Sequence, residues 1–223
     1  MKLAKAVGLP TANADIYHEK ITLYCTERFD RYINKKKKLQ RLHQEDFCQA
    51  LSIMSEHKYE SEGGPTLNQC FRVLKKYSAQ PVLDQLKLLQ WIIFNYLIGN
   101  ADGHAKNIAM LFTPDGPELA PFYDLFCTAI YESLSSKLAM KIGGENRPQW
   151  IQQQHWERLA KNNNFNPKII SSLAKNIVDK IFTASKNISQ EILDVLPEDK
   201  KYLEKIHQVI ETRAQKISKW INL

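Results

Sequence analysis

The longest run of regularly spaced apolar residues lies between Val82 and Leu97, and it predicts a helix. Apolar residues recur there every three or four positions, and further leucine, isoleucine and aromatic residues fill most of the helix circumference. A helix that is apolar nearly all round is buried by the rest of its domain. Gly99 follows the run, and glycine is the residue that most often ends a helix in the left-handed conformation.

Shorter patterns precede this helix. We expect helices over Lys2–Val7, Gln44–Met54 and Leu67–Tyr77, strands over Ala14–Tyr17 and Ile21–Thr26, and a loop over Tyr59–Pro65. The four lysines from Lys35 to Lys38 are typical of a solvated hairpin tip, with a phosphate-binding patch as the alternative.

The pattern changes after Gly99. It predicts strands over Ile108–Phe112 and Glu118–Phe122 around a Pro-Asp-Gly turn, then a purely helical tail from Pro148 onward. In that tail, Trp150, Trp156 and Trp220 are expected in the core, with a nucleotide-stacking surface as the alternative.

Composition narrows the class of protein. The chain has 223 residues, enough for one large or two small domains, and 43% of them are hydrophobic. Its net charge of +7 permits a nucleic-acid or acidic partner without requiring one. The four cysteines form no C-x-x-C pair, which favours reduced core thiols over disulfide or zinc frameworks. With no signal peptide, and with Trp91–Ile98 too short to span a bilayer, we expect a cytoplasmic protein without membrane contact.

Three polar residues stand out between Gly99 and Asp124. Asp102 and Asn107 lie five residues apart in one loop, and the strand after Asn107 returns through a turn near Asp115. A hairpin centred on that turn pairs Asn107 roughly with Tyr123. Asp124 is therefore expected beside Asn107, with Asp102 nearby.

This arrangement suits metal-dependent phosphoryl transfer. Magnesium prefers hard oxygen ligands and keeps several waters, so Asn107, Asp124 and phosphate oxygens suffice to hold it. A separate carboxylate, Asp102, is then available as the base for an acceptor hydroxyl. Protein kinases place an aspartate, an asparagine five residues later and a metal-binding aspartate in this same order. The alternative is a polar loop that caps the buried helix. His104 is similarly expected to be an ordinary loop histidine, with a metal ligand as the alternative.

The sequence also resembles a known family. The segments IGNADGHAKN and LAPFYD resemble the catalytic and metal-binding loops of the HipA-like bacterial serine/threonine kinases. Five further segments agree in order: LAKAVGLP, ERFDR, HQEDFCQAL, KYESEGGP and KLAMKIGG. The resemblance covers almost the whole chain and is most specific up to Gly144.

The resemblance implies roles for individual residues. Asp102 would be the catalytic base, and Asn107 and Asp124 would hold Mg²⁺. His104, Lys106 and Tyr123 would line the phosphates or the metal. Glu27, Arg28 and Phe29 of ERFDR would form the hinge that binds the adenine of ATP, largely through backbone groups.

It also implies a fold and a setting. We expect an α+β fold, mostly helical, equivalent to the large lobe of a protein kinase with short β-hairpins. Residues 1–31 would hold the end of the N-terminal lobe and the hinge, and residues 32–223 the helical catalytic lobe. Members of the family are usually toxins of toxin–antitoxin modules. They phosphorylate a serine or threonine of a translation-related protein, an aminoacyl-tRNA synthetase in known cases, and associate with a helix-turn-helix antitoxin that binds DNA.

One departure from the family tempers these expectations. None of the eight glycines forms a G-x-G-x-x-G, and no lysine before the hinge lies in a strand that would pair it with phosphates. The chain is therefore expected to begin after the glycine-rich lobe, as a fragment, an internal start or one of two separately encoded halves. Alone it is expected to be nearly inactive. A truncated lobe acting as a non-catalytic binding module and a small-molecule kinase remain alternatives.

Overall fold

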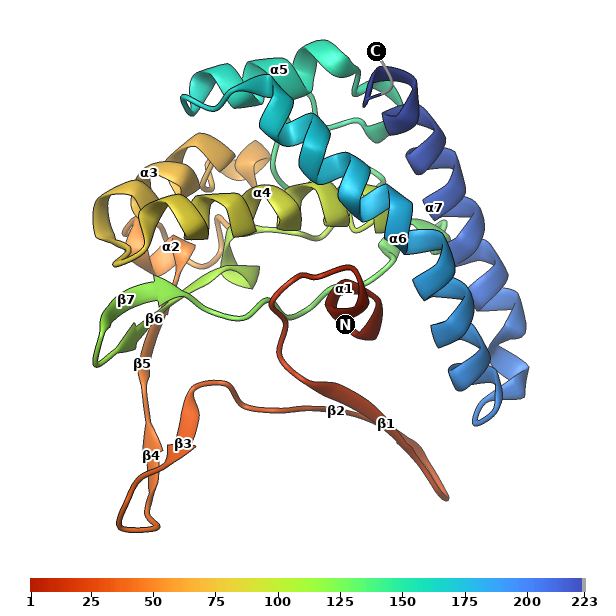
Figure 1. Ribbon diagram of the computed structural model, residues 1–223, viewed down its shortest axis with the longest axis horizontal. Coiled ribbons are helices and arrows are strands. Elements are labelled where there is room, and N and C mark those ends of the chain that lie inside the picture. Colours follow the sequence, from red (N-terminus) through yellow and green to blue (C-terminus); the bar gives the residue numbers. More distant parts are fainter. Residues whose placement is uncertain (222–223) are drawn as a thin grey trace.

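The computed structural model describes residues 1–221 and has a mostly helical body with small antiparallel sheets (Figure 1). The helices are α1 (Lys2–Ala6), α2 (Phe47–Ala50), α3 (Leu67–Tyr77), α4 (Pro81–Ile98), α5 (Gln153–Asn162), α6 (Pro167–Leu193) and α7 (Lys200–Ile221). The strands are β1 (Ala14–His18), β2 (Thr22–Thr26), β3 (Arg31–Ile33), β4 (Leu39–Arg41), β5 (His43–Asp46), β6 (Ala109–Thr113) and β7 (Gly116–Leu119). The predicted α+β fold is confirmed.

Helix α4 is the central element, as its apolar sequence predicts. It packs against α3, α6 and α7, and its last residues from Trp91 to Ile98 are all buried. Gly99 ends the helix with a φ of 77°, and a Cβ there would lie 2.7 Å from Val209 Cγ1 and 2.8 Å from Ala129 Cβ. Only glycine both adopts this positive φ readily and leaves room for Val209 and Ala129. Gly99 therefore sets the direction in which the chain leaves α4.

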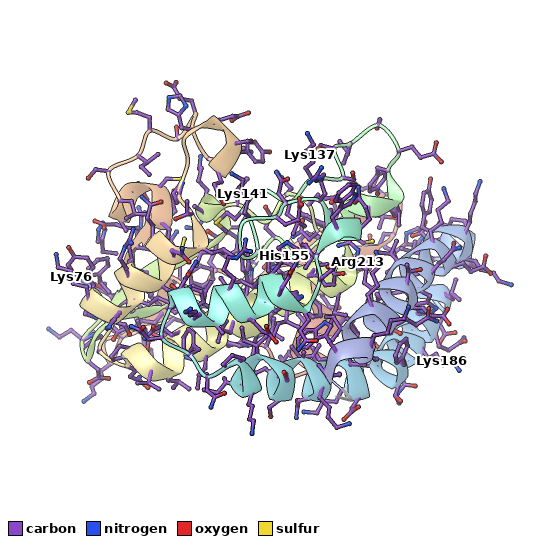
Figure 2. The ribbon with its side chains drawn as sticks, turned by 90° about the horizontal axis from the view of Figure 1, so that it is seen from above. Lys76, Lys137, Lys141, His155, Lys186 and Arg213 are labelled. Atoms are coloured by element: carbon purple, nitrogen blue, oxygen red, sulfur yellow. The ribbon has the colours of Figure 1, made fainter. Side chains whose placement is uncertain are left out.

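The helical tail holds the end of α4 in place. Helices α6 and α7 lie side by side along one flank of the body (Figure 1). Arg213 of α7, labelled in Figure 2, donates a hydrogen bond of 2.7 Å to the carbonyl of Tyr96. A cation at the carboxyl end of a helix is favourable because carbonyl groups there lack partners. The C-terminal helix therefore stabilises the segment that leads into the Gly99–Asn107 loop.

The sheets are small and antiparallel. Strands β5, β6 and β7 form a three-stranded sheet in that order, with Met110 opposite Leu119. Strands β1 and β2, and strands β3 and β4, form two separate ribbons that extend from the body (Figure 1). The ribbons and the turn of β1–β2 carry exposed apolar side chains, namely Tyr17, Ile21, Leu23, Tyr24, Tyr32, Ile33 and Leu39. The predicted strands at 14–17 and 21–26 and the lysine-rich tip of β3–β4 are confirmed.

The predicted helix at Gln44–Met54 is much too long, because only Phe47–Ala50 is helical. Residues 43–46 form β5 instead, paired with β6 so that Gln44 lies opposite Leu111. Asp46 then caps the short helix α2, because its side chain accepts from the amide of Gln49 at 2.9 Å. Leu51 ends that helix, and Ser52 follows with a φ of 55°. The acidic residues therefore precede α2 rather than occupying the first turn of a longer helix.

Smaller corrections concern cysteines, tryptophans and loops. Cys48 and Cys70 are buried as predicted, but Cys25 is exposed and Cys127 is only partly buried. Trp156 is buried, whereas Trp150 is 58% exposed and lies under the guanidinium of Arg147. The predicted loop at Tyr59–Pro65 contains a 3-10 turn at Glu60–Glu62. Among residues 1–221, no helix is both long and apolar enough to span a lipid bilayer.

Candidate active site

The loop after α4 is organised by a buried asparagine. Asn100 is 2% exposed and donates to Asn95 Oδ1 of α4 at 2.7 Å. Its own Oδ1 accepts from the amide of Asp102 at 3.0 Å, and its Nδ2 lies 3.4 Å from the carbonyl of Asp124. Buried polar groups are costly unless paired, so these bonds fix both aspartate backbones relative to α4.

The expected neighbours Asn107 and Asp124 are in direct contact. Asn107 Nδ2 donates to Asp124 Oδ2, and Asn107 Oδ1 accepts from the amide of His104 at 3.3 Å. The β6–β7 hairpin returns the chain toward Asn107, as the sequence predicts, although its second strand is Gly116–Leu119 rather than the predicted Glu118–Phe122. Asp124 has a φ of 60°, a conformation that aspartate and asparagine adopt more readily than most residues.

The donor set suits magnesium bound together with phosphates. Within residues 1–221, no group of three or more His, Cys, Asp or Glu side chains is placed to bind a metal on its own. A carboxylate and an amide oxygen are nevertheless the hard ligands that Mg²⁺ takes when phosphate oxygens and water complete its shell. Asn107 and Asp124 therefore fit a metal that arrives with a nucleotide better than a metal in a closed protein cage.

Asp102 lies in the same loop at the edge of a cleft. Its side chain is 47% exposed, and its Oδ1 accepts a hydrogen bond of 2.5 Å from the hydroxyl of Tyr59. The cleft has a volume of about 440 Å³, and its lining includes Tyr59, Glu62, Asp102, Thr128, Leu134 and Lys137. A substrate hydroxyl in this cleft could reach the Asp102 carboxylate.

His104 is buried beside Asp102, with its Nε2 3.9 Å from Asp102 Oδ1. Burial lowers the pKa of His104, although the nearby carboxylates of Asp102 and Asp124 act in the opposite direction. The ring packs edge-on against Tyr59 with centroids 5.5 Å apart. Burial and the bond to Asp102 raise the pKa of Tyr59 to about 12, so its hydroxyl remains a donor. Among the described residues, His104 joins no cluster typical of a metal site.

The predicted hinge reaches the site through one residue. Phe29 stacks on Tyr123 with centroids 5.8 Å apart, and the Tyr123 hydroxyl donates to the carbonyl of Lys106 at 2.7 Å. Burial raises the pKa of Tyr123. The side chain of Lys106 is partly exposed.

The other two hinge side chains are engaged elsewhere. Glu27 accepts from Asn13 Nδ2 at 2.6 Å, and Arg28 makes a bidentate pair with Asp30. Both residues are exposed at the surface. The predicted hinge thus offers a nucleotide mainly its backbone and the ring of Phe29.

Sequence reasoning missed two residues that hold the site together. Asn100 stands directly between the helix-ending glycine and the candidate base, where a polar residue in an otherwise apolar context could have marked it. Tyr59 lies 43 positions before Asp102. Nothing in the local pattern of the chain points to that contact.

Comparisons with known proteins identify the family of this chain. Residues 1–187 match the HipA-like C-terminal domain. The serine/threonine-protein kinase toxin HipA of Shewanella oneidensis is 38% identical over 164 residues, which cover 68% of this chain and 38% of that protein. The protein Y4mE of Sinorhizobium fredii is 39% identical over 196 residues, covering 87% of this chain and 47% of the relative. The chain thus spans less than half the length of these relatives.

Solved structures give the same result. A structure of the HipA, HipB and operator DNA complex from the Shewanella oneidensis toxin–antitoxin system matches the whole chain with a TM-score of 0.86 and 30% identity, over 55% of its own chain. The Helicobacter pylori proinflammatory kinase CtkA matches 97% of this chain and 81% of its own with a TM-score of 0.53 at 15% identity, a likeness of fold alone. Since the family match covers most of its residues, this chain belongs to the HipA-like C-terminal domain family.

Proposed function

We propose that this chain carries the catalytic and metal-binding half of an ATP- and Mg²⁺-dependent protein serine/threonine kinase of the HipA type. The observation that carries the proposal is the direct contact between Asn107 and Asp124, with Asp102 in the same loop and open to a cleft. Residues 1–31 would provide the end of the N-terminal lobe and the hinge, and residues 32–223 the catalytic lobe.

Each side chain has a separate task in this proposal. Mg²⁺-ATP supplies the phosphoryl group when bound, and Asn107 and Asp124 hold the metal. Asp102 accepts the proton of the acceptor hydroxyl, and the side-chain oxygen of Asn100, which accepts from the amide of Asp102, keeps that aspartate in place. Phe29 and Tyr123 pack together where the hinge meets the metal site. Phosphoryl transfer depends mostly on such positioning and electrostatic stabilisation.

Partners are proposed by similarity. The Shewanella structure contains HipA with HipB and operator DNA. We therefore propose an antitoxin partner for this chain, with DNA contacted only through that antitoxin. The exposed apolar side chains of the β1–β2 and β3–β4 ribbons also favour a covering segment, in the same or a separate polypeptide, that completes the nucleotide site.

Labelled ATP provides the test. The purified chain, alone and with the polypeptides encoded beside its gene, is incubated with Mg²⁺ and γ-labelled ATP. Label on a protein serine or threonine supports the proposal, whereas label on a metabolite supports a small-molecule kinase. Nucleotide-independent partner binding without transfer in any combination would favour the non-catalytic binding module.

A matched pair of variants assigns the base. Asp102→Asn keeps the size of the side chain and should lower transfer by about 10²–10⁴-fold, the usual contribution of a positioned base. Asp115→Asn changes an exposed aspartate in the β6–β7 turn and should leave transfer unchanged. Transfer at the parental rate by Asp102→Asn would remove Asp102 from this role.

A further inference from the structure

The two oxygens of Asp102 have different surroundings. Oδ1 accepts the 2.5 Å hydrogen bond from Tyr59 and lies 3.9 Å from Nε2 of His104. Within residues 1–221, no side chain or backbone group donates a hydrogen bond to Oδ2. A carboxylate can accept several hydrogen bonds, so one oxygen is held by the protein while the other remains available to a substrate.

The loop that carries Tyr59 is held rigidly. The amide of Gly64 donates to the carbonyl of Tyr59 at 2.9 Å. A Cβ on Gly64 would lie 2.4 Å from the carbonyl oxygen of His57 and 2.6 Å from that of Tyr59, so no larger residue fits. The ring of Tyr59 meanwhile rests against His104. Tyr59 therefore has little freedom to move away from Asp102.

A third segment, around Ala139, joins the loop of Tyr59 to the loop that carries the proposed base, Asp102. Ala139 donates from its amide to the carbonyl of Ala101 at 2.9 Å, and its own carbonyl accepts from the amide of Glu60 at 3.0 Å. The Glu60 carboxylate also accepts from the amide of Lys141 at 2.7 Å. Figure 2 labels Lys137 and Lys141 on this segment, which runs between the Tyr59 loop and α5. Residues next to Tyr59 and Asp102 are thus joined through one residue, Ala139.

We infer that Tyr59 is a positioning residue, which fixes the Asp102 carboxylate so that Oδ2 faces the acceptor hydroxyl in the cleft. This inference rests on the proposed kinase function. Tyr59 itself contacts neither of the proposed metal ligands by a hydrogen bond, and it does not exchange a proton with the substrate. Without its hydroxyl, the half-exposed carboxylate of Asp102 would rotate among several orientations.

Proton NMR of the 223-residue chain tests the contact without any need for activity. A hydroxyl proton in a short bond to a carboxylate should resonate far downfield of the amide and indole protons. The signal should vanish in Tyr59→Phe and move upfield in Asp102→Asn, where the acceptor is neutral. Tyr77→Phe, at the exposed end of α3, should retain the signal. No downfield signal in the parent chain, or one that survives in Tyr59→Phe, would overturn the inference while leaving the kinase proposal intact.

Kinetic measurements test the positioning role of Tyr59. They use the combination of polypeptides that transfers phosphate in the labelled-ATP experiment. Tyr59→Phe should lower kcat by about 10–100-fold, as loss of outer contacts to a reacting group usually does, while KM for Mg²⁺-ATP stays the same. A parental kcat in Tyr59→Phe would refute the positioning role. So would a loss of stability and of ATP affinity in that variant large enough to account for its lower activity. A chain with the proton signal but no transfer in any combination would refute both the role and the kinase proposal.

Discussion

At the scale of single residues, Asp124 joins an unusual backbone conformation to a proposed metal ligand. Its φ of 60° places the carboxylate against Asn107. Aspartate and asparagine tolerate this conformation because their short polar side chains bond locally. The backbone therefore restricts which residues fit at this position, independently of any metal.

The first prediction separates charge from strain at Asp124. Both Asp124→Ala and Asp124→Asn should weaken Mg²⁺-ATP binding by at least about tenfold, because even residues that only support a metal ligand contribute that much. Only Asp124→Ala should also lower the free energy of unfolding appreciably, because alanine is strained at positive φ. Calorimetry with and without Mg²⁺ measures the affinity for Mg²⁺-ATP, on the chain together with whatever segment it needs to bind nucleotide. Urea unfolding of the chain measures the change in stability. A magnesium dependence equal to that of the parent in both variants would exclude Asp124 as a ligand.

Much of the site could be predicted because its key residues are close in sequence. Asp102 and Asn107 share one loop, and a hairpin of ordinary length returns the chain to Asp124. The contact of Tyr59 with Asp102 could not be predicted, since it depends on how a loop 43 positions away folds against the loop of Asp102. The preference of the HQED segment for a strand was equally hidden, because its partner β6 lies more than 60 residues away.

At the scale of elements, the junction between α4 and the base loop depends on Gly99. Gly99→Ala should lower the free energy of unfolding by more than about 2 kcal/mol, because left-handed backbone strain adds to overlap with Val209 and Ala129. Gly63→Ala is the control, since Gly63 also has positive φ but a Cβ there would meet no atom within 4 Å. It should cost only the left-handed backbone strain itself, about 1–2 kcal/mol. Urea unfolding measures the free energy of unfolding of both variants. Equal decreases in Gly99→Ala and Gly63→Ala would show that close packing at Gly99 is unimportant.

A second element-scale feature is the attachment of the β3–β4 ribbon to the hinge. Asp30 is 1% exposed and pairs with Arg28, Arg31 and Arg41. The hydrogen bonds from Arg28, helped by Arg31, lower the pKa of Asp30 although burial opposes this. The ionised form is therefore favoured by folding. Its contribution to stability is complete above the unfolded pKa, about 4, and is lost as pH falls through the lower folded pKa.

The pH dependence gives the third prediction. Asp30→Asn should lower the free energy of unfolding by about 1–3 kcal/mol at pH 7, the usual worth of hydrogen bonds to a charged group. The difference in free energy of unfolding between the parent and Asp30→Asn should become smaller as pH falls from about 5 to 3. Asp179→Asn, in an exposed 3.5 Å pair with Lys175 on α6, should have little effect at any pH. Urea unfolding over this pH range would contradict the argument if the difference for Asp30→Asn stayed constant.

At the scale of the whole molecule, the substrate cleft and the predicted nucleotide hinge meet the site at different residues. Asp102 opens toward the cleft next to residues 134–139, whereas the predicted hinge meets the site at Tyr123, beside Asp124, and lines no part of that cleft. On the body side, Asn95 of α4 holds the loop of Asp102 through the side chain of Asn100. By contrast, Ile21, Ile33 and Leu39 on the ribbons are each at least 67% exposed. Exposed apolar surface of this kind marks a site of association.

The last prediction follows from this asymmetry. The 223 residues contain no G-x-G-x-x-G loop to cover the phosphates, and the hinge residues Glu27 and Arg28 are exposed, so this chain alone would hold a nucleotide from one side only. We expect its turnover of ATP to be at least about 100-fold below that of the chain together with a covering segment, because misplacement of about 1 Å already costs that much. Turnover and ATP affinity are measured for the purified chain, with the covering segment supplied in cis or as a separate polypeptide. Ile33→Ser and Leu39→Ser on the ribbon should weaken this complementation, whereas Val82→Ser on the exposed start of α4 should not. Robust protein phosphorylation by the 223-residue chain alone would contradict the prediction, and would mean that another of its segments clamps the phosphates.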